Sequence, residues 1–264
     1  MPIALVTGVS SGIGRATALE LARRGFEVVA AGRSAGRTQP VVDLIRAEGG
    51  SAEFLELDLA SLASVGAAAA RFGDSGRQLD VLINNAGVGV NRRQRTEDGF
   101  EPHFGINHLG HFHLTNRLMP GLGRDARVVS LASAVHFRAR GIDFDKMRRA
   151  PRLTGYYEYA VSKLANILFI RELARRRGDL LAFAVHPGLV RTRLIPTLVR
   201  PLMAGQMLSA EQGADTVVWC ATSDLPTGHS GGYFQRRELA IPSIQAQDDD
   251  LARELWERSE DWCR

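Results

Sequence analysis

The chain has 264 residues, of which 45% are hydrophobic and 23% charged, the composition of a globular protein long enough to bury a sizeable core. Its net charge of +4 is spread along the chain without a dense basic run, so we expect no nucleic-acid partner. Two distant cysteines, Cys220 and Cys263, indicate neither a zinc site nor a disulfide framework. With no apolar run of 18 residues and no room for a signal peptide, we expect a cytoplasmic protein without a membrane anchor.

Apolar runs rich in Val, Ile and Leu alternate with segments of helical period along the whole chain. The runs predict strands at residues 3–7, 26–31, 52–57, 81–84, 126–133, 180–188 and, more briefly, 231–235. Helices are predicted at residues 13–24, 40–48, 62–72, 101–118 and 159–177. This alternation predicts an α/β fold, a doubly wound parallel sheet of about seven strands with helices on both faces. Residues 138–154 and 190–209 are less regular, but the rhythm resumes after each, so we expect a single domain over 1–264.

A glycine-rich loop, "TGVSSGIG" at residues 7–14, follows the first strand and opens the first helix. Glycines at Gly8, Gly12 and Gly14 allow a tight turn and a close approach of backbone to a pyrophosphate. The N–H groups and positive dipole end of the next helix would then face those phosphates. A turn that merely tolerates glycine is the alternative, but the position after the first strand favours a dinucleotide site.

The residues after the second strand indicate which dinucleotide is bound. Folds that select NAD place an acid here for the ribose 2′-hydroxyl, whereas an arginine accommodates the 2′-phosphate of NADP. After this strand the chain has Arg33 and Arg37, and the first acidic residue that follows them is Asp43. Guanidinium groups bind phosphate in a fork, so we expect NADP(H), although both arginines could instead be ordinary solvated residues.

Four motifs together resemble the short-chain dehydrogenase/reductase family. They are "TGVSSGIG", "NNAG" at residues 84–87, "YAVSK" at residues 159–163 and "HPGLVRT" at residues 186–192. Longer stretches such as "DGFEPHFGINHLGHFHLTNRL" and "YAVSKLANILFIRELARR" are similar to its retinol-dehydrogenase-like branch. The resemblance covers nearly the whole chain and implies a Rossmann fold. Membrane-bound enzymes of that branch carry an N-terminal hydrophobic anchor, which is missing here, so we expect a soluble bacterial member.

The resemblance implies a role for each matching position. Tyr159 would be the proton donor or acceptor, and Lys163 would hold the nicotinamide ribose and lower the tyrosine pKa. Ser133 would bind the substrate oxygen, and Asn107 would support a proton-relay water. Asp58 would meet the adenine and Thr192 the carboxamide. The expected cofactor-binding residues are Gly8, Ser10, Ser11, Gly12, Ile13, Gly14, Arg33, Arg37, Asp58, Leu59, Asn85, Ala86, Gly87, Tyr159, Lys163, Pro187, Gly188, Val190 and Thr192.

Helical spacing selects the same tyrosine from three neighbours. Only Tyr159 lies four residues before a lysine, and residues four apart share a helix face. A free phenol has a pKa of about 10, and an ammonium within about 4–6 Å favours the phenolate. Tyr156 and Tyr157 are expected to pack or to line a pocket.

Two other signals have competing interpretations. His108, His111 and His113 could form a metal site, but neither carboxylates nor cysteines flank them, so we expect structural histidines and no metal. Residues 190–209 are apolar and contain arginines, as in a membrane-surface helix or, as we favour, a lid over an apolar substrate. The expected substrate-binding residues are Ser133, Val88, Phe137, Leu194, Ile195, Leu198 and Met203.

These observations predict an NADP(H)-dependent oxidoreductase that interconverts a hydrophobic ketone or aldehyde and its alcohol. An epimerase or dehydratase on the same fold and a dinucleotide-sensing protein without turnover are the alternatives. By resemblance, the chain would form a homodimer or homotetramer.

Overall fold

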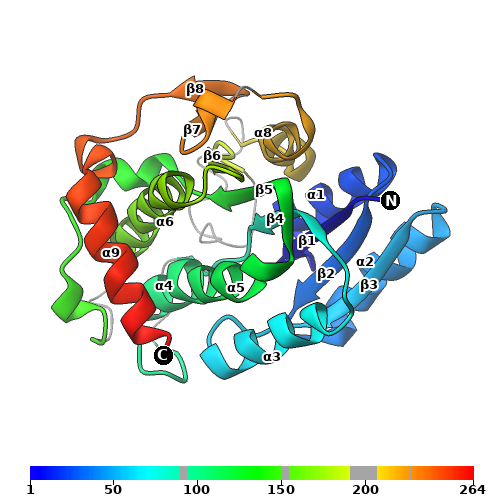
Figure 1. Ribbon diagram of the computed structural model, residues 1–264, viewed down its shortest axis with the longest axis horizontal. Coiled ribbons are helices and arrows are strands. Elements are labelled where there is room, and N and C mark those ends of the chain that lie inside the picture. Colours follow the sequence, from blue (N-terminus) through cyan, green and yellow to red (C-terminus); the bar gives the residue numbers. More distant parts are fainter. Residues whose placement is uncertain (90–93, 150–154, 191–206, 226) are drawn as a thin grey trace.

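The computed structural model describes residues 1–89, 94–149, 155–190, 207–225 and 227–264. One eight-stranded sheet forms its centre, in the order β3-β2-β1-β4-β5-β6-β7-β8 (Figure 1). All neighbours are parallel except β7 and β8, which pair antiparallel. The strands are β1 Ile3–Thr7, β2 Glu27–Gly32, β3 Ser51–Glu56, β4 Leu79–Asn84, β5 Leu122–Leu131, β6 Leu181–His186, β7 Tyr233–Gln235 and β8 Glu238–Ala240.

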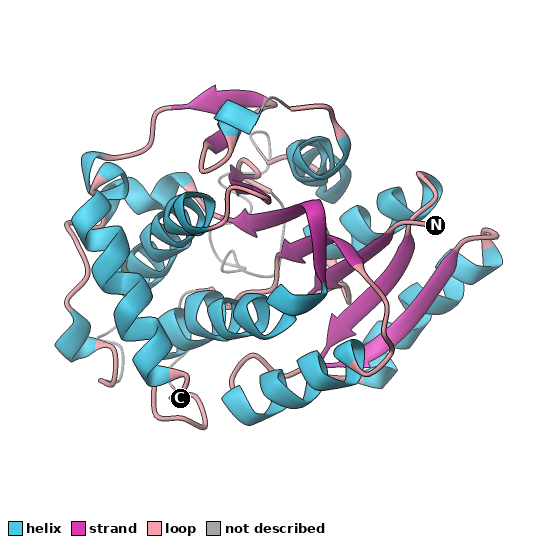
Figure 2. Cartoon of the chain, viewed as in Figure 1, coloured by secondary structure: helices cyan, strands magenta, loops and turns pink. Residues whose placement is uncertain are grey.

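Helices cover both faces of this sheet (Figure 2). The longer helices are α1 Gly12–Arg23, α2 Ala35–Ala47, α3 Leu62–Gly73, α5 Gly110–Leu118, α6 Tyr156–Arg176, α8 Ala210–Thr222 and α9 Asp249–Trp262. Side chains of α1, α2 and α8 share one hydrophobic core with the sheet. Those of α3, α5, α6 and α9 share a second core on the other face.

The two cores explain why the central strands contain continuous apolar runs. In β1, Leu5 belongs to the core beneath α3, α5 and α6, whereas its neighbours Ala4 and Val6 belong to the core beneath α1 and α8. Because side chains alternate between the faces of a strand and both faces are covered, the successive positions from Ile3 to Val6 in β1 are all apolar. The predicted doubly wound α/β fold is therefore confirmed.

Several boundaries differ from the prediction. The second helix begins at Ala35, ahead of Pro40, because Pro40 and Gly36 are exposed and water can bind the carbonyl that proline leaves without a donor. The helix predicted at residues 159–177 is α6, which begins three residues earlier at Tyr156, after Gly155 in a left-handed conformation. The helices α8 and α9 and the three-residue edge strand β8 were not predicted from the sequence.

The helix predicted at residues 101–118 is divided into three consecutive parts. An α-helical turn, α4 Pro102–Phe104, leads into a π-helical turn, η1 Gly105–Leu109, and then into α5. Such π turns insert one extra residue into the hydrogen-bonding ladder and often occur at functional sites. Here the π turn contains Asn107.

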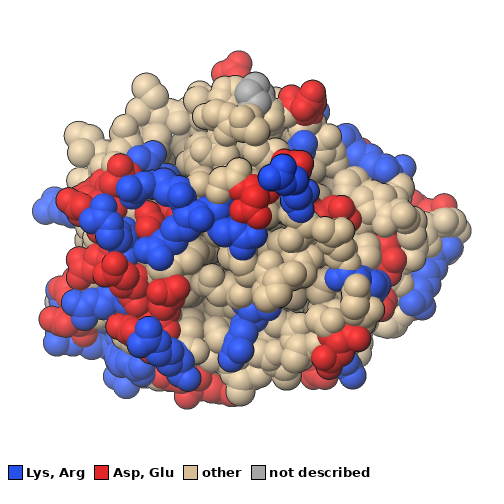
Figure 3. Space-filling view, viewed as in Figure 1, with Lys and Arg blue, Asp and Glu red and all other residues tan. Residues whose placement is uncertain are grey.

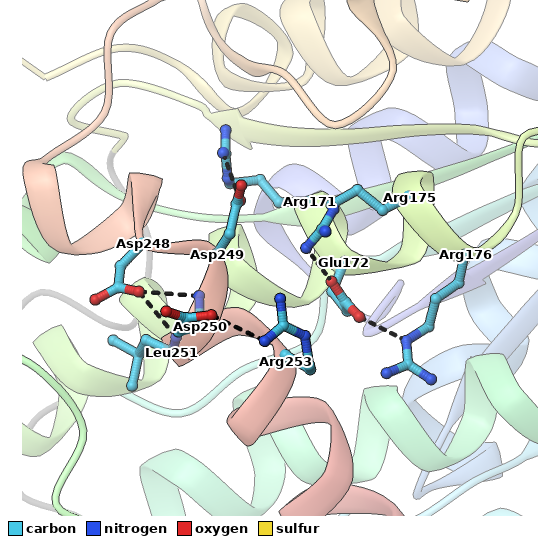
Figure 4. A network of polar contacts seen from close by, with 9 residues as sticks. All are labelled: Arg171, Glu172, Arg175, Arg176, Asp248, Asp249, Asp250, Leu251 and Arg253. Atoms are coloured by element: carbon cyan, nitrogen blue, oxygen red, sulfur yellow. Dashed lines mark hydrogen bonds and ion pairs between the residues drawn. The ribbon is translucent and has the colours of Figure 1, made fainter.

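The C-terminal helix α9 packs on α6 through a polar network (Figure 4). Arg171 of α6 donates to Asp249 at 2.9 Å, at the start of α9 (Figure 4). Glu172 accepts from Arg175 and Arg176 of its own helix, so its largely buried carboxylate is paired. Within this network the Arg171–Asp249 contact joins α9 to the helix that carries Tyr159, and Leu255 and Trp256 of α9 share the apolar core of that helix.

On the face drawn in Figure 3, basic and acidic side chains lie beside one another. Each helix in the described part of the chain is too short or too polar to cross a lipid bilayer.

Candidate active site

A large cavity opens where the strand order reverses between β1 and β4, at the carboxyl ends of the strands. In open α/β sheets this is where ligands bind. The cavity has a volume of about 790 Å³ and takes residues from the ends of β1, β2, β4 and β5, from the start of α1 and from α6.

Two glycines of the loop, Gly8 and Gly14, are packed too closely to carry a side chain. Gly8 has φ +74°, and a Cβ atom there would lie 2.9 Å from the Cα of Ala86. At Gly14 a Cβ would lie 2.3 Å from the Asn85 side-chain nitrogen and 2.5 Å from the Gly8 carbonyl oxygen. The loop and the "NNAG" segment therefore pack directly on each other, and each needs the other's small residues.

Thr7 connects the two motifs by hydrogen bonds. Its hydroxyl accepts from the backbone N–H groups of Asn85 and Ala86, both at 2.9 Å. Its carbonyl oxygen accepts from the Asn85 side-chain amide at 2.7 Å. His111 Nε2 lies 2.9 Å from the same hydroxyl. These contacts fix the loop after β4 against the loop after β1.

The other end of the cavity is cationic. Arg33 follows β2, Arg37 lies in the first turn of α2, and both line the cavity with exposed side chains. Neither guanidinium makes a hydrogen bond or ion pair with the described part of the chain. Asp58, after β3, also lines the cavity, and its carboxylate accepts from the Ala60 N–H at 3.0 Å.

These features fit a dinucleotide. The N-terminus of α1 meets the cavity, and its N-cap Ser11 makes no side-chain capping bond, so its backbone donors are available to phosphate oxygens. The unpaired Arg33 and Arg37 would add two further donors to a phosphate at the adenosine end.

Tyr159 and Lys163 lie one turn apart on α6, and both line the cavity. The Lys163 ammonium lies 5.7 Å from the centre of the Tyr159 ring and donates to the Leu131 carbonyl oxygen at 2.8 Å. Asn166, one further turn along, donates to the same oxygen at 2.9 Å. Ser133 follows β5 and contacts the Tyr159 hydroxyl, although it is not among the residues that line the cavity.

The predicted lowering of the Tyr159 pKa by Lys163 is wrong for the protein chain alone. Burial dominates and raises the pKa of Tyr159 to about 12, against the smaller lowering by Ser133. Burial also lowers the pKa of Lys163 to about 8. Both side chains are therefore shifted toward their uncharged forms.

Asn107 lies behind the cavity, fully buried in the π turn. Its side-chain oxygen accepts from the Val88 N–H at 2.7 Å, and its amide donates to the Val88 carbonyl at 3.1 Å and to Ser162 at 3.0 Å. Its own carbonyl oxygen lies 3.1 Å from His111 Nδ1. In this arrangement the Asn107 side chain holds the wall of the cavity.

Most of the predicted cofactor and substrate positions meet in this one cavity. Those that line it are Gly8, Ser10, Ser11, Gly12, Ile13, Gly14, Arg33, Arg37, Asp58, Leu59, Asn85, Ala86, Gly87, Val88, Tyr159, Lys163 and Pro187. Gly188 and Val190 do not line it: Gly188 forms a turn at φ +84°, and Val190 bridges to Leu208. Phe137 does not line it either, and its side chain is 56% exposed. Thr192, Leu194, Ile195, Leu198, Met203 and most of the predicted lid lie outside the described residues.

Several residues of this site were not predicted from the sequence. Thr7 is one, although it begins the glycine motif; Gly89 and Ala132 also line the cavity. Tyr156 and Tyr157, expected to pack or line a pocket, are 43% and 49% exposed, and Tyr157 borders a separate cavity with Arg140 and Glu101.

The three neighbouring histidines lie in separate environments. Burial lowers the pKa of His108 to about 3 and that of His111 to about 4, so both are neutral at physiological pH. Among the described residues, His, Cys, Asp and Glu side chains form no group of three suited to a metal ion.

Comparisons with known proteins give the family. Residues 2–201 match the short chain dehydrogenase family. The chain is 43% identical to mouse polyprenol dehydrogenase, over 96% of this chain and 81% of that protein. It is 40% identical to human retinol dehydrogenase 14, over 97% and 84% of the two chains.

Two solved structures agree with this result. An uncharacterized protein from Mycobacterium paratuberculosis has a TM-score of 0.83 at 37% identity, over 100% of this chain and 93% of that chain. A short chain dehydrogenase from Burkholderia cenocepacia, in complex with NADP, has a TM-score of 0.72 at 27% identity, over 94% and 98%. The chain therefore belongs to the short-chain dehydrogenase/reductase family of oxidoreductases, in its retinol-dehydrogenase-like branch.

Proposed function

We propose that the protein is an NADP(H)-dependent enzyme that interconverts a hydrophobic ketone or aldehyde and the corresponding alcohol. The observation that carries the proposal is that Tyr159 and Lys163 line a cavity that begins at the glycine loop, with Ser133 in contact with the Tyr159 hydroxyl. When bound there, the reduced nicotinamide supplies a hydride, a hydrogen nucleus with its two electrons, to the carbonyl carbon.

The Tyr159 hydroxyl supplies the proton that the carbonyl oxygen then needs. Because burial holds its pKa near 12, the phenol stays protonated at neutral pH, as a proton donor must. The Ser133 hydroxyl donates a second hydrogen bond to the oxygen as its negative charge develops. Lys163, anchored on the Leu131 carbonyl, lies where it can bind the nicotinamide ribose.

NADP(H) rather than NAD(H) is proposed because Arg33 directly follows β2, where an acid would serve a ribose hydroxyl, and Arg37 lies close by in the first turn of α2. The bound NADP of the Burkholderia cenocepacia structure supports the same choice. A hydrophobic substrate is proposed because two relatives are named for polyprenol and retinol, which are apolar alcohols, and because Val88 lies on the cavity wall. Assembly as a homodimer or homotetramer remains a prediction.

The proposal is tested by mixing the purified protein with NADPH and a panel of hydrophobic ketones and aldehydes. Steady oxidation of NADPH with formation of the alcohol is expected. If NADPH binds tightly but is not oxidised with any carbonyl, the protein is a dinucleotide-binding protein instead.

A further inference from the structure

A buried acid–histidine pair lies directly behind Tyr159. Glu101 and His103 are 2% and 0% exposed, and His103 Nδ1 lies 2.5 Å from Glu101 Oε1. The second carboxylate oxygen accepts from the Phe104 N–H at 2.8 Å and so caps the N-terminus of α4. Each carboxylate oxygen therefore has a partner within this short segment.

The hydrogen-bonding partners assign one proton of this pair. His103 Nε2 lies 3.0 Å from the Gly89 carbonyl oxygen, which can only accept, so Nε2 carries a hydrogen. One hydrogen bond joins Nδ1 to Oε1 of Glu101, so the histidine and the acid satisfy each other's buried polar atoms.

The pair touches the two segments that form the catalytic end of the cavity. On one side, the ring of His103 packs edge-on to that of Tyr159, with centroids 6.2 Å apart and planes at 75°. A Cβ atom on Gly155, the N-cap of α6, would lie 2.6 Å from His103 Cε1, so the first turn of α6 rests directly on the imidazole. On the other side, Gly89 lines the cavity next to Val88.

We propose that the hydrogen-bonded Glu101–His103 pair is a positioning device that fixes the Tyr159 ring and the Val88–Gly89 wall relative to each other. The inference rests on the proposed function, in which Tyr159 is the proton donor. His103 acts through Tyr159 and has no direct contact with the reacting atoms. Asn107, from the same helical segment, holds Val88 by its backbone N–H and carbonyl, so the wall is fixed at two successive residues.

The first test is a set of variants assayed for kcat and for the KM of NADPH. Glu101→Gln/His103→Leu removes the pair without leaving a lone buried charge. Because a small misplacement of a reacting group can lower the rate by about 10²-fold, we expect kcat to fall by about 10- to 100-fold, with the KM of NADPH changed by less than about 3-fold. Glu101→Gln can keep each hydrogen bond with a neutral imidazole and should lose much less kcat than Glu101→Leu.

His108→Leu is the matched control. His108 is a buried histidine of the same helical segment, but its Nε2 lies 3.1 Å from Ser259 of α9, away from the cavity. It should lower the melting temperature as the double variant does, with wild-type kcat. Equal effects of the control and the double variant on kcat, or an unchanged kcat in the double variant, would overturn the proposal.

The second test does not depend on turnover, and it therefore applies even if the wild-type protein reduces no carbonyl and the proposed function fails. Histidine ring NMR on the full chain should show a hydrogen on Nε2 of His103, the nitrogen that faces the Gly89 carbonyl. The Tyr159 ring signal, assigned by its loss in Tyr159→Phe, should shift in Glu101→Gln/His103→Leu and stay in place in His108→Leu. A His103 Nε2 without a hydrogen, or an unmoved Tyr159 signal, would overturn the inference by itself.

Discussion

The Lys163 ammonium lies 5.7 Å from the centre of the Tyr159 ring, one helical turn further along α6. Burial opposes a charge on either side chain: it raises the pKa of Tyr159 to about 12 and lowers that of Lys163 to about 8. The site thus holds a neutral phenol ready to donate a proton, next to a cation that the protein keeps buried at a cost in stability.

Lys163→Met tests the cost in stability of burying the Lys163 ammonium. The pKa of Lys163 is about 8 in the folded chain and 10.5 in its usual state, so between these pH values the unfolded chain binds more protons, and wild-type stability should rise with pH. Below pH 8 the full cost applies. We expect Lys163→Met to be more stable than wild type at neutral pH, by up to about 3 kcal/mol, with the gain shrinking toward about pH 10.

Denaturant unfolding at several pH values measures this difference. Lys146→Met is the control, because Lys146 is the only other lysine, is 52% exposed and pairs with Asp143 at the surface. A Lys163→Met protein that is less stable than wild type at neutral pH would show that the ammonium is not held at a cost.

Arg33→Asp tests the choice of coenzyme. A hydrogen bond to a charged group contributes about 1.5–3 kcal/mol, so the KM of NADPH should rise by about 10- to 100-fold while that of NADH stays level or falls. Arg71→Asp on α3 is the matched control, since Arg71 is exposed and does not line the cavity. Unchanged preference for NADPH in Arg33→Asp would remove this residue from cofactor recognition.

Gly14→Ala tests the contact between the glycine loop and the "NNAG" segment. The added methyl group would lie 2.3 Å from the Asn85 side chain and 2.5 Å from the Gly8 carbonyl. We expect the free energy of unfolding to fall by about 1–3 kcal/mol and the dissociation constant of NADPH to rise at least about 10-fold.

Gly73→Ala, at the last residue of α3, is the companion variant because a Cβ atom there meets no atom within 4 Å. It should leave the dissociation constant unchanged. Thermal unfolding and NADPH fluorescence report both quantities, and wild-type cofactor affinity in Gly14→Ala would show that the close packing does not shape the site.

The central strands are predictable because both faces of the sheet are covered, which requires the apolar runs Ile3–Val6 in β1 and Val81–Ile83 in β4. Gly8 and Gly14 can be recognised from the glycine spacing of the loop, and Tyr159 from its position four residues before Lys163 on a helix. The elements that were not predicted, β8, α8 and α9, all follow residues 190–209, whose sequence has no regular pattern of apolar residues.

Properties that depend on how deeply a side chain is buried could not be predicted from the spacing of residues. The sign of the Tyr159 pKa shift follows from burial, which spacing on a helix does not reveal. The same holds for Glu101 and His103, two residues apart in "EPH", whose pairing depends on the sharp turn into α4.

Tyr159→Phe tests the central claim most directly, with Tyr157→Phe, on the exposed side of the same helical turn, as its control. In steady-state reduction of a hydrophobic ketone by NADPH, we expect kcat to fall by about 10²-fold or more in Tyr159→Phe, with NADPH affinity retained and Tyr157→Phe unchanged. A Tyr159→Phe enzyme that keeps wild-type kcat would contradict the assignment of Tyr159 as the proton donor.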